Sequence, residues 1–151
     1  MNSQNMTVTI DPFEPVYAIG IAAKKMGVSP ETLRLYEREG LLITHKTKTG
    51  RRLYSQKDLE WIACIRRQIK DHKLNLAGIR RLLALIPCWE IKQCSREEKE
   101  SCPAYMSSDQ VCWNIKETGA RCVMDDCRIC NVYLTALKVG HLKELLKLSV
   151  K

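Results

Sequence analysis

The sequence predicts a mainly α protein: a winged helix-turn-helix domain, then a small cysteine-rich module stapled by metal, then a C-terminal helix. In the first half of the chain, helix-capping residues and apolar residues at helical spacing predict several short helices. That half is also basic, because residues 1–87 carry a net charge of +7 and residues 88–151 only +1. Seven of the eight cysteines lie after residue 87. The chain therefore divides into two parts of different chemistry.

The composition is that of a globular protein. The chain has 151 residues, of which 45% are hydrophobic and 28% are charged. Residues 1–15 form a polar N-terminal tail, and the start "MNSQNMTVTI" has no basic segment followed by an apolar one, so no secretory signal is expected. No apolar run approaches the roughly 20 residues that a membrane helix needs. We expect a cytoplasmic protein with no membrane partner.

Residues 16–87 begin with the pattern of two short helices after a brief strand-like piece. The first helix is expected to stop at Gly27. Ser29 is a good N-cap for the second helix, and Pro30 suits its first position, where no amide hydrogen is missed. Gly40 provides a left-handed C-cap. Two helices around a Gly-containing turn predict a helix-turn-helix, whose second helix would enter a DNA major groove.

The next segment, "LLITHKTKTGRRLY", predicts a hairpin, because apolar and polar residues alternate on both sides of a glycine. Four cations lie in this hairpin, within a span of seven residues. They are Lys46, Lys48, Arg51 and Arg52. A cationic hairpin beside a recognition helix is a wing, and the wing is predicted to contact DNA.

Two more helices complete this part of the chain. Ser55 and Asp58 form a capping box, and an apolar stripe follows at helical spacing. Asn75 caps the last helix, and Pro87 ends it. The residues predicted to be core are Leu33, Trp61, Ile62 and the thiol of Cys64.

Three motifs carry a family resemblance: "VSPETLRLYEREGLL", "RRLYSQKDLEWI" and "NLAGIRRLL". They resemble the DNA-binding domain of MerR-family transcription regulators, and most of all its heat-shock-repressor (HspR-like) branch, over roughly residues 16–86. The resemblance implies a homodimer that binds double-stranded DNA at a near-palindromic operator. It also implies RNA polymerase as a partner at the promoter.

The resemblance also implies particular DNA contacts. Arg34 and Tyr36 match the family's R-x-Y pair in the second helix, and Arg52 and Tyr54 match the pair after the wing. Together with Thr32, at the exposed start of the second helix, and the wing cations, the predicted DNA-binding residues are Thr32, Arg34, Tyr36, Lys46, Lys48, Arg51, Arg52 and Tyr54. The alternative interpretation of the two tyrosines is that they are partly buried core residues.

Residues 88–133 contain an internal duplication. The block "CWEIKQC", followed by "CPAY", returns as "CWNIKETGARC", followed by "CRICNVY". Each block has Cys-Trp, then a Cys, then Cys-x-x-Tyr. The equivalent cysteines are Cys88 with Cys112, Cys94 with Cys122, and Cys102 with Cys130, and Cys127 is extra. A pseudo-symmetric small module is therefore expected.

A module of this size cannot easily build its own core, and disulfides are disfavoured in the cytoplasm, so a metal staple is predicted. No histidine lies inside the module, so the ligands would all be thiolates. They are Cys88, Cys94, Cys102, Cys112, Cys122, Cys127 and Cys130. The uneven spacing does not distinguish zinc from an iron–sulfur cluster.

The duplicated pattern also resembles the bacterial two-CW cysteine-rich domain, which implies no settled cofactor. The cysteines are either only structural or the effector part of a metal or redox sensor. A third interpretation makes the protein a thiol redox or metal-transfer protein with an incidental basic half. Against it, no βαβ pattern surrounds the C-x-x-C at Cys127 and Cys130. We expect a regulator and not an enzyme.

Residues 134–151 predict a C-terminal amphipathic helix. Its leucines are spaced to form one apolar stripe, with an interruption near Gly140. A helix of this kind at the end of a chain has to bury its stripe, and in MerR-like proteins it pairs two subunits. We therefore expect this segment to be the dimerisation helix.

Overall fold

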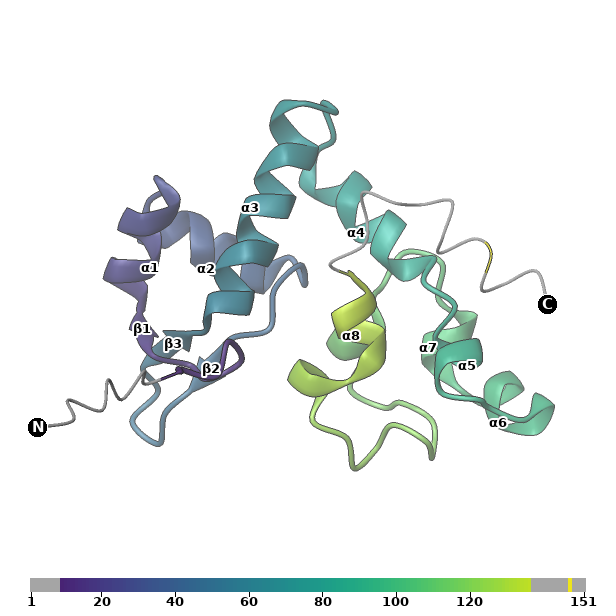
Figure 1. Cartoon of the computed structure of the whole chain (residues 1–151). Helices are drawn as coiled ribbons and strands as arrows, with labels where there is room; N and C mark the ends of the chain where they lie inside the picture. The colour runs from purple at the N-terminus through teal and green to yellow at the C-terminus, as the bar shows by residue number, and fades with distance from the viewer. Residues whose placement is uncertain (1–8, 137–146, 148–151) are drawn as a thin grey trace, which may run out of the picture.

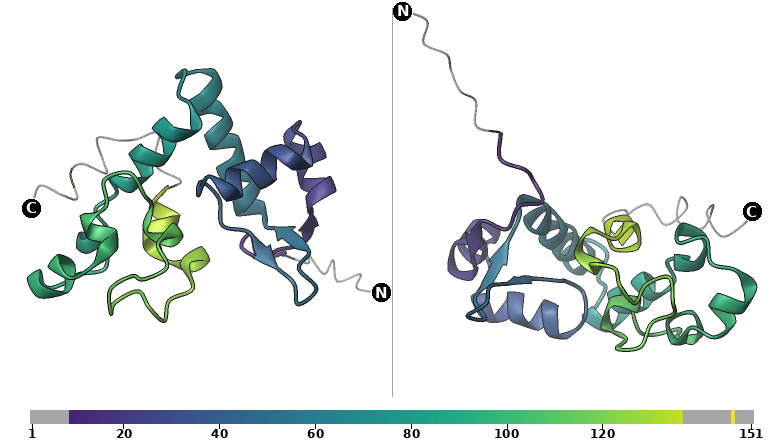
Figure 2. Two further views of the ribbon diagram at one scale, coloured as in Figure 1. Left: turned by 180° about the vertical axis from the view of Figure 1, so that it is seen from behind. Right: turned by 90° about the horizontal axis from the view of Figure 1, so that it is seen from below.

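The computed structural model describes residues 9–136 and 147 (Figure 1). Within them a small sheet and four helices form an N-terminal half, and several short helices form a C-terminal half. Figure 2 shows the two halves side by side, connected through α3 and α4. The mainly α fold class is confirmed, while a metal-stapled state of the module stays a prediction.

The helix-turn-helix forms as predicted. Helix α1 (Ile19–Met26) ends at Gly27, whose φ of 64° is left-handed. The Ser29 side chain then accepts a hydrogen bond from the backbone amide of Thr32 and caps α2 (Pro30–Arg38). Gly40, with a φ of 77°, turns the chain out of α2.

The wing is part of a three-stranded antiparallel sheet in the order β1-β3-β2. Strands β2 (His45–Lys46) and β3 (Arg52–Tyr54) are the two sides of the predicted hairpin. The strand-like piece at Tyr17–Ala18 is β1, and it pairs with β3 in the register Tyr17 opposite Tyr54. The sheet therefore connects the start of α1 to the base of the wing.

Helix α3 (Gln56–Lys70) supplies the centre of the core. Its capping box between Ser55 and Asp58 is present, and Asn75 caps α4 (Leu76–Ala84), as the sequence predicts. The predicted core positions Leu33, Trp61, Ile62 and Cys64 are all buried, at no more than 4% exposed. In addition, the indole Nε1–H of Trp61 donates to the carbonyl of Leu41 at 2.6 Å.

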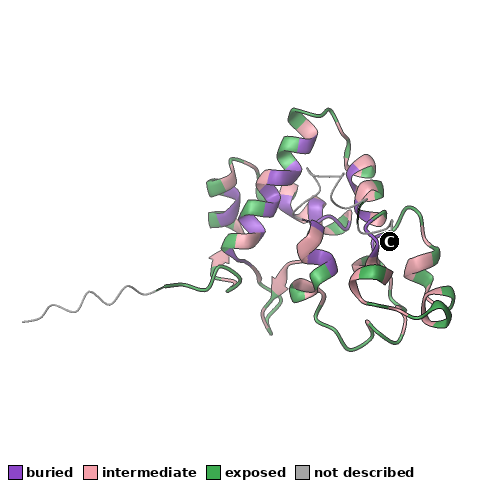
Figure 3. Ribbon diagram, turned by 45° about the vertical axis from the view of Figure 1, so that its right-hand side comes forward, coloured by how far each residue is buried: buried purple, intermediate pink, exposed green. Residues whose placement is uncertain are grey.

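The C-terminal half consists of short elements: α5 (Cys88–Ile91), α6 (Arg96–Glu100), α7 (Pro103–Met106), the 3₁₀ turns η1 (Cys112–Asn114) and η2 (Cys127–Ile129), and α8 (Asn131–Ala136). Helices α5, α6 and α7 bury none of their residues (Figure 3). Four residues of this half are buried in one core cluster with the N-terminal half. They are Val111, Val132, Tyr133 and Ala136. The module therefore shares the core of its neighbour.

Most of the predicted C-terminal helix lies outside the described residues. Helix α8 begins at Asn131, before the predicted start at residue 134, and only 134–136 and 147 of the remaining chain are described. The assignment of 134–151 to dimerisation stays a prediction. Within the described residues, no helix has both the length and the apolarity to cross a membrane.

Candidate nucleic-acid interface and cysteine cavity

The exposed face of α2 presents the first predicted DNA contacts. Arg34 is partly exposed and forms an ion pair with Glu31 one turn earlier. Thr32 is partly buried, and its hydroxyl lies 3.0 Å from the hydroxyl of Ser29. Thr32 therefore pairs with the N-cap residue Ser29. Arg34, in contrast, can exchange its exposed carboxylate partner for a nucleic acid.

Glu37 of α2 holds the wing, which the sequence did not reveal. Its carboxylate pairs with Lys46 at 2.9 Å and with Arg52, one cation from each strand of the wing. Burial alone would raise the pKa of Glu37, but the hydrogen bonds and charges of Arg52 and Lys46 outweigh it and lower the pKa. Two of the predicted DNA-binding cations therefore also fix the wing against α2.

The other two wing cations are free of such pairing. Lys48 and Arg51 lie at the exposed tip of the hairpin, and no ion pair involves either of them within the described residues. Gly50 forms the turn between them with a φ of 82°. The tip is thus the most available positive charge of the wing.

The placement of the two tyrosines corrects the predicted contacts. Tyr36 is 5% exposed and Tyr54 is completely buried, so both rings belong to the core, as the alternative interpretation held. Burial is the main cause that raises the pKa of Tyr54, to about 12. In both R-x-Y pairs the arginine is partly exposed and the tyrosine is buried.

Comparison with known families agrees with this geometry. Residues 17–86 match the family described as "MerR HTH family regulatory protein". Residues 17–86 are a MerR-family helix-turn-helix domain. The match ends at residue 86, before the first cysteine of the duplicated module.

Several curated relatives share this MerR-type domain. A "Putative heat shock protein HspR" of Streptomyces coelicolor is 41% identical over 71 residues, 47% of each chain. The "HTH-type transcriptional regulator ZntR" of Escherichia coli is 36% identical over 72 residues, 46% of this chain and 50% of its own. "HTH-type transcriptional regulator GlnR" of Bacillus anthracis is 34% identical over 71 residues, 47% of this chain and 54% of its own. The chain thus spans about half the length of the curated relatives it matches.

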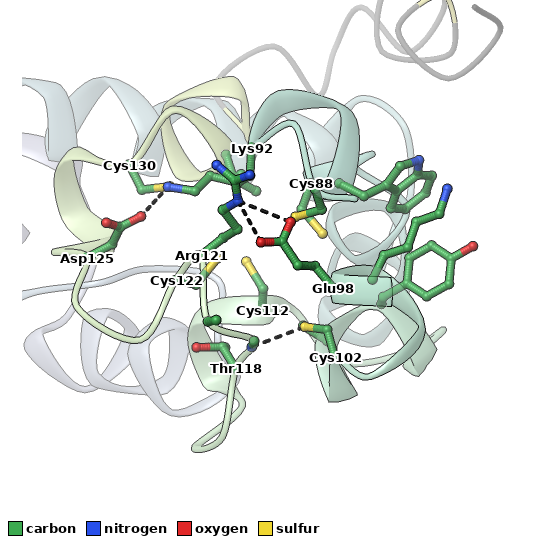
Figure 4. Close-up of a pocket in the computed structure, with 18 of the residues that line it drawn as sticks. Cys88, Lys92, Glu98, Cys102, Cys112, Thr118, Arg121, Cys122, Asp125 and Cys130 are labelled. Carbon is green, nitrogen blue, oxygen red and sulfur yellow. Dashed lines mark hydrogen bonds and ion pairs between the residues drawn. The ribbon is translucent and has the colours of Figure 1, made fainter. Parts of the chain in front are cut away.

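Beside the MerR-type domain, a cavity of about 40 Å³ is lined by all seven cysteines of the module. Figure 4 shows the sulfur atoms of Cys88, Cys112 and Cys122 facing the same space. All eight cysteines of the chain are described, and none of these eight forms a disulfide. Two ion pairs bracket the cavity: Arg121 with Glu98, and Lys92 with Asp125.

Burial raises the pKa of several thiols of the cavity. Burial raises the pKa of Cys88 to about 11 and that of Cys112 to about 12, and neighbouring thiols add to both shifts. Burial also raises the pKa of Cys127 in the C-x-x-C pair. Reactive redox cysteines have lowered pKa values, so this environment does not favour thiol catalysis.

The seven thiols that line the cavity are suitable ligands for a soft metal, but the described side chains are not arranged around one metal position. Seven thiols line the cavity, with no histidine among the described residues around them, which is the ligand chemistry of zinc–thiolate and iron–sulfur sites. Within the same described part of the chain, however, no three His, Cys, Asp or Glu side chains are arranged to hold one ion. The seven thiols thus supply the ligand type for a soft metal, and which of them would bind one ion stays a prediction.

The internal duplication is visible as a repeated aromatic pair. Trp89 meets Tyr105 edge to face, with ring centroids 5.1 Å apart and an interplanar angle of 90°. Trp113 meets Tyr133 at the same 5.1 Å and at 83°. The equivalence that the sequence predicts between the two repeats thus extends to their side-chain geometry.

The second of these pairs contacts the link between α2 and β2, residues 40–43. The indole Nε1–H of Trp113 donates to the carbonyl of Gly40 at 2.7 Å. The phenol oxygen of Tyr133 accepts a hydrogen bond from the amide of Ile43 at 3.2 Å. The second repeat is therefore seated on the MerR-type domain directly after its recognition helix.

Gly40→Ala should destabilise the protein more than Gly50→Ala. Both glycines have left-handed φ values, so alanine costs about 1–2 kcal/mol of backbone strain at either position. A Cβ on Gly40 would also lie 2.8 Å from Cγ of Asn114, whereas a Cβ on Gly50 meets nothing within 4 Å. Urea unfolding measures the two losses of stability. Equal losses would contradict the close approach of Asn114, and Asn114→Ala should rescue only the first variant.

Proposed function

We propose that the protein is a DNA-binding transcription regulator of the MerR type, which binds a near-palindromic operator as a homodimer. The observation that carries the proposal is the MerR-type domain with an exposed Arg34 on α2 and a cationic wing beside it. Relatives over this region are named as transcriptional regulators, which supports the same class. RNA polymerase at the promoter is the expected protein partner. Retardation of the protein's own promoter DNA in a gel tests the class.

The cysteine cavity is, in this proposal, the effector site and binds metal through thiolates. The ligands are drawn from the seven cysteines that line it, and bound metal would supply folding free energy to a module whose helices α5 to α7 bury none of their residues. The similarity to the regulator named ZntR covers 46% of this chain, so the cavity itself is the main support. Metal analysis and the absorbance spectrum of anaerobically purified protein separate zinc from an iron–sulfur cluster.

Arg34→Ala should reduce discrimination between operator and random DNA. If the guanidinium contacts a base edge, its removal costs roughly 1–3 kcal/mol at the operator and little elsewhere. Arg52→Ala should instead weaken binding to all sequences about equally, because Arg52 lies on the wing and is expected to hold phosphate. Titrations of both DNAs at one salt concentration measure the two effects.

Glu37→Gln is the matched control for Arg52→Ala. It removes the carboxylate partner of Arg52 but keeps the cation itself. If Arg52 contacts phosphate directly, the glutamine variant retains most of the affinity. If the glutamine variant is weakened as much as the alanine variant, Arg52 acts by positioning the wing. Operator binding like that of wild type by both arginine variants would contradict the assigned contacts.

A further inference from the structure

Three side chains of the second cysteine repeat contact the MerR-type domain, and each follows closely on a cysteine of the cavity. The pairs are Trp113 after Cys112, Arg128 after Cys127, and Tyr133 after Cys130. The carbonyl of Cys130 accepts the first helical hydrogen bond of α8, from the amide of Leu134, so Cys130 and Tyr133 belong to one turn. A displacement of these cysteines is therefore carried directly to the contacts.

Trp113 and Tyr133 contact the chain where it enters the wing. Together with Trp61, they bind three backbone groups of the link between α2 and β2: the carbonyl of Gly40, the carbonyl of Leu41 and the amide of Ile43. Two of these three hydrogen bonds come from the cysteine module. The second repeat thus contributes two of the hydrogen bonds that hold the link between α2 and the wing.

Arg128 contacts the chain where it leaves the wing. Its guanidinium lies 3.2 Å from the carboxylate of Asp58, which is 5% exposed. The same carboxylate accepts a hydrogen bond from the amide of Ser55 at 2.7 Å in the capping box of α3. Because Ser55 directly follows the last residue of β3, the second repeat holds both ends of the wing.

The first repeat has the same aromatic pair without these contacts. Trp89 and Tyr105 meet edge to face, as Trp113 and Tyr133 do. In the described part of the chain, however, no hydrogen bond or ion pair joins either side chain of the first pair to residues 17–86. The duplication therefore offers an internal comparison, with one repeat in contact with the wing and one that is not.

We propose that the cysteine cavity controls the wing of its own subunit, and that binding of a soft, thiophilic metal cation moves both ends of the wing through the second repeat. The proposal rests on the proposed function of the cavity as a metal site. In the described part of the chain, no three of these side chains are arranged to hold one ion, and three cysteines of the cavity are closely followed by the residues that contact the wing. Control within one subunit is distinct from control through the spacing of two subunits.

The experiment compares full-length Trp113→Phe and Tyr133→Phe with Trp89→Phe and Tyr105→Phe. Each substitution keeps an aromatic ring and removes the indole N–H or the hydroxyl. For each protein, Zn²⁺ stoichiometry and operator affinity are measured anaerobically, first after chelation and then after addition of Zn²⁺. Arg128→Gln, a change at a partly exposed position, provides a further test of the contact at Asp58 that does not alter the aromatic pairs.

In the wild type, Zn²⁺ should change operator affinity on the order of 5- to 150-fold, the usual range of coupling between two sites. The Trp113, Tyr133 and Arg128 variants should bind the same amount of Zn²⁺ but show little of that change, whereas the Trp89 and Tyr105 variants should keep it. Equal coupling in all the variants, or equal loss in all of them, overturns the inference. Bound Zn²⁺ without any effect on wild-type affinity overturns only the inference. Absence of both zinc and iron from anaerobically purified protein, together with absence of Zn²⁺ binding, overturns the metal site as well.

Discussion

Raising monovalent salt from about 50 to 200 mM should weaken operator binding by about 10³- to 10⁵-fold, if the dimer makes about six to ten phosphate contacts. That number requires about three to five phosphate contacts from each subunit, and the candidates are the wing cations Lys46, Lys48, Arg51 and Arg52. Each neutralised phosphate releases condensed counterions, which makes the decrease in affinity steep. Fluorescence anisotropy across a salt series gives the slope.

A variant at the wing tip tests whether the hairpin supplies these phosphate contacts. Lys48→Gln with Arg51→Gln removes two exposed cations that no ion pair uses in the described structure. The log–log slope should become shallower by about 0.9 for each phosphate that is no longer neutralised, counted over both subunits. Lys24→Gln with Lys25→Gln, on α1 outside the predicted DNA-binding residues, is the matched control. A flat salt response in the wild type would contradict the assignment of the wing.

Removal of metal, by chelation or by Cys127→Ser with Cys130→Ser, should lower the thermal stability of the protein strongly. Binding of a structural metal contributes on the order of 10 kcal/mol of folding free energy, and a domain of this size has little other reserve. The double variant should also have a lower metal stoichiometry. Circular dichroism melts of anaerobically purified protein, with metal analysis, measure both effects.

Cys64→Ala is the control for this metal prediction. Cys64 is buried in α3 and does not line the cavity, so its replacement should remove a small packing contribution and no metal. If the melting temperature stayed unchanged after complete removal of metal from the cavity, the metal would contribute nothing to the stability of the fold. A wild type that contains no metal after anaerobic purification would refute the thiolate site.

Local signals predicted most of the MerR-type domain. Ser29, Ser55 and Asn75 cap their helices through atoms three residues away, so the information lies within a few positions of the sequence. The internal duplication was predicted for the same reason, since each repeat preserves its Trp and Tyr in order. The aromatic pairs of the structure follow from that order.

Contacts between distant residues could not be predicted in this way. The burial of Tyr54 depends on packing around the sheet and not on its R-x-Y motif. The hydrogen bond from Trp113 to Gly40 joins residues 73 positions apart, and nothing in the duplicated sequence distinguishes Trp113 from Trp89 in this respect. The pairing of Glu37 with Lys46 and Arg52 could not be predicted either, because an acidic residue on a helix gives no local sign of partners in a later hairpin.

Sequence similarity to the MerR family ends at residue 86, but the hydrophobic core does not. Residues 17–86 and the cysteine module are therefore expected to fold cooperatively. Val111, Val132, Tyr133 and Ala136 complete a hydrophobic cluster whose other members lie mainly in residues 22–86. A polypeptide that ended at Pro87 would leave the link after α2 without two of its hydrogen bonds and part of that cluster open to water. During synthesis on the ribosome, the MerR-type domain would therefore reach its final packing only after the cysteine repeats had emerged. Completion of the fold of residues 17–86 would then be coupled to synthesis of the cysteine repeats.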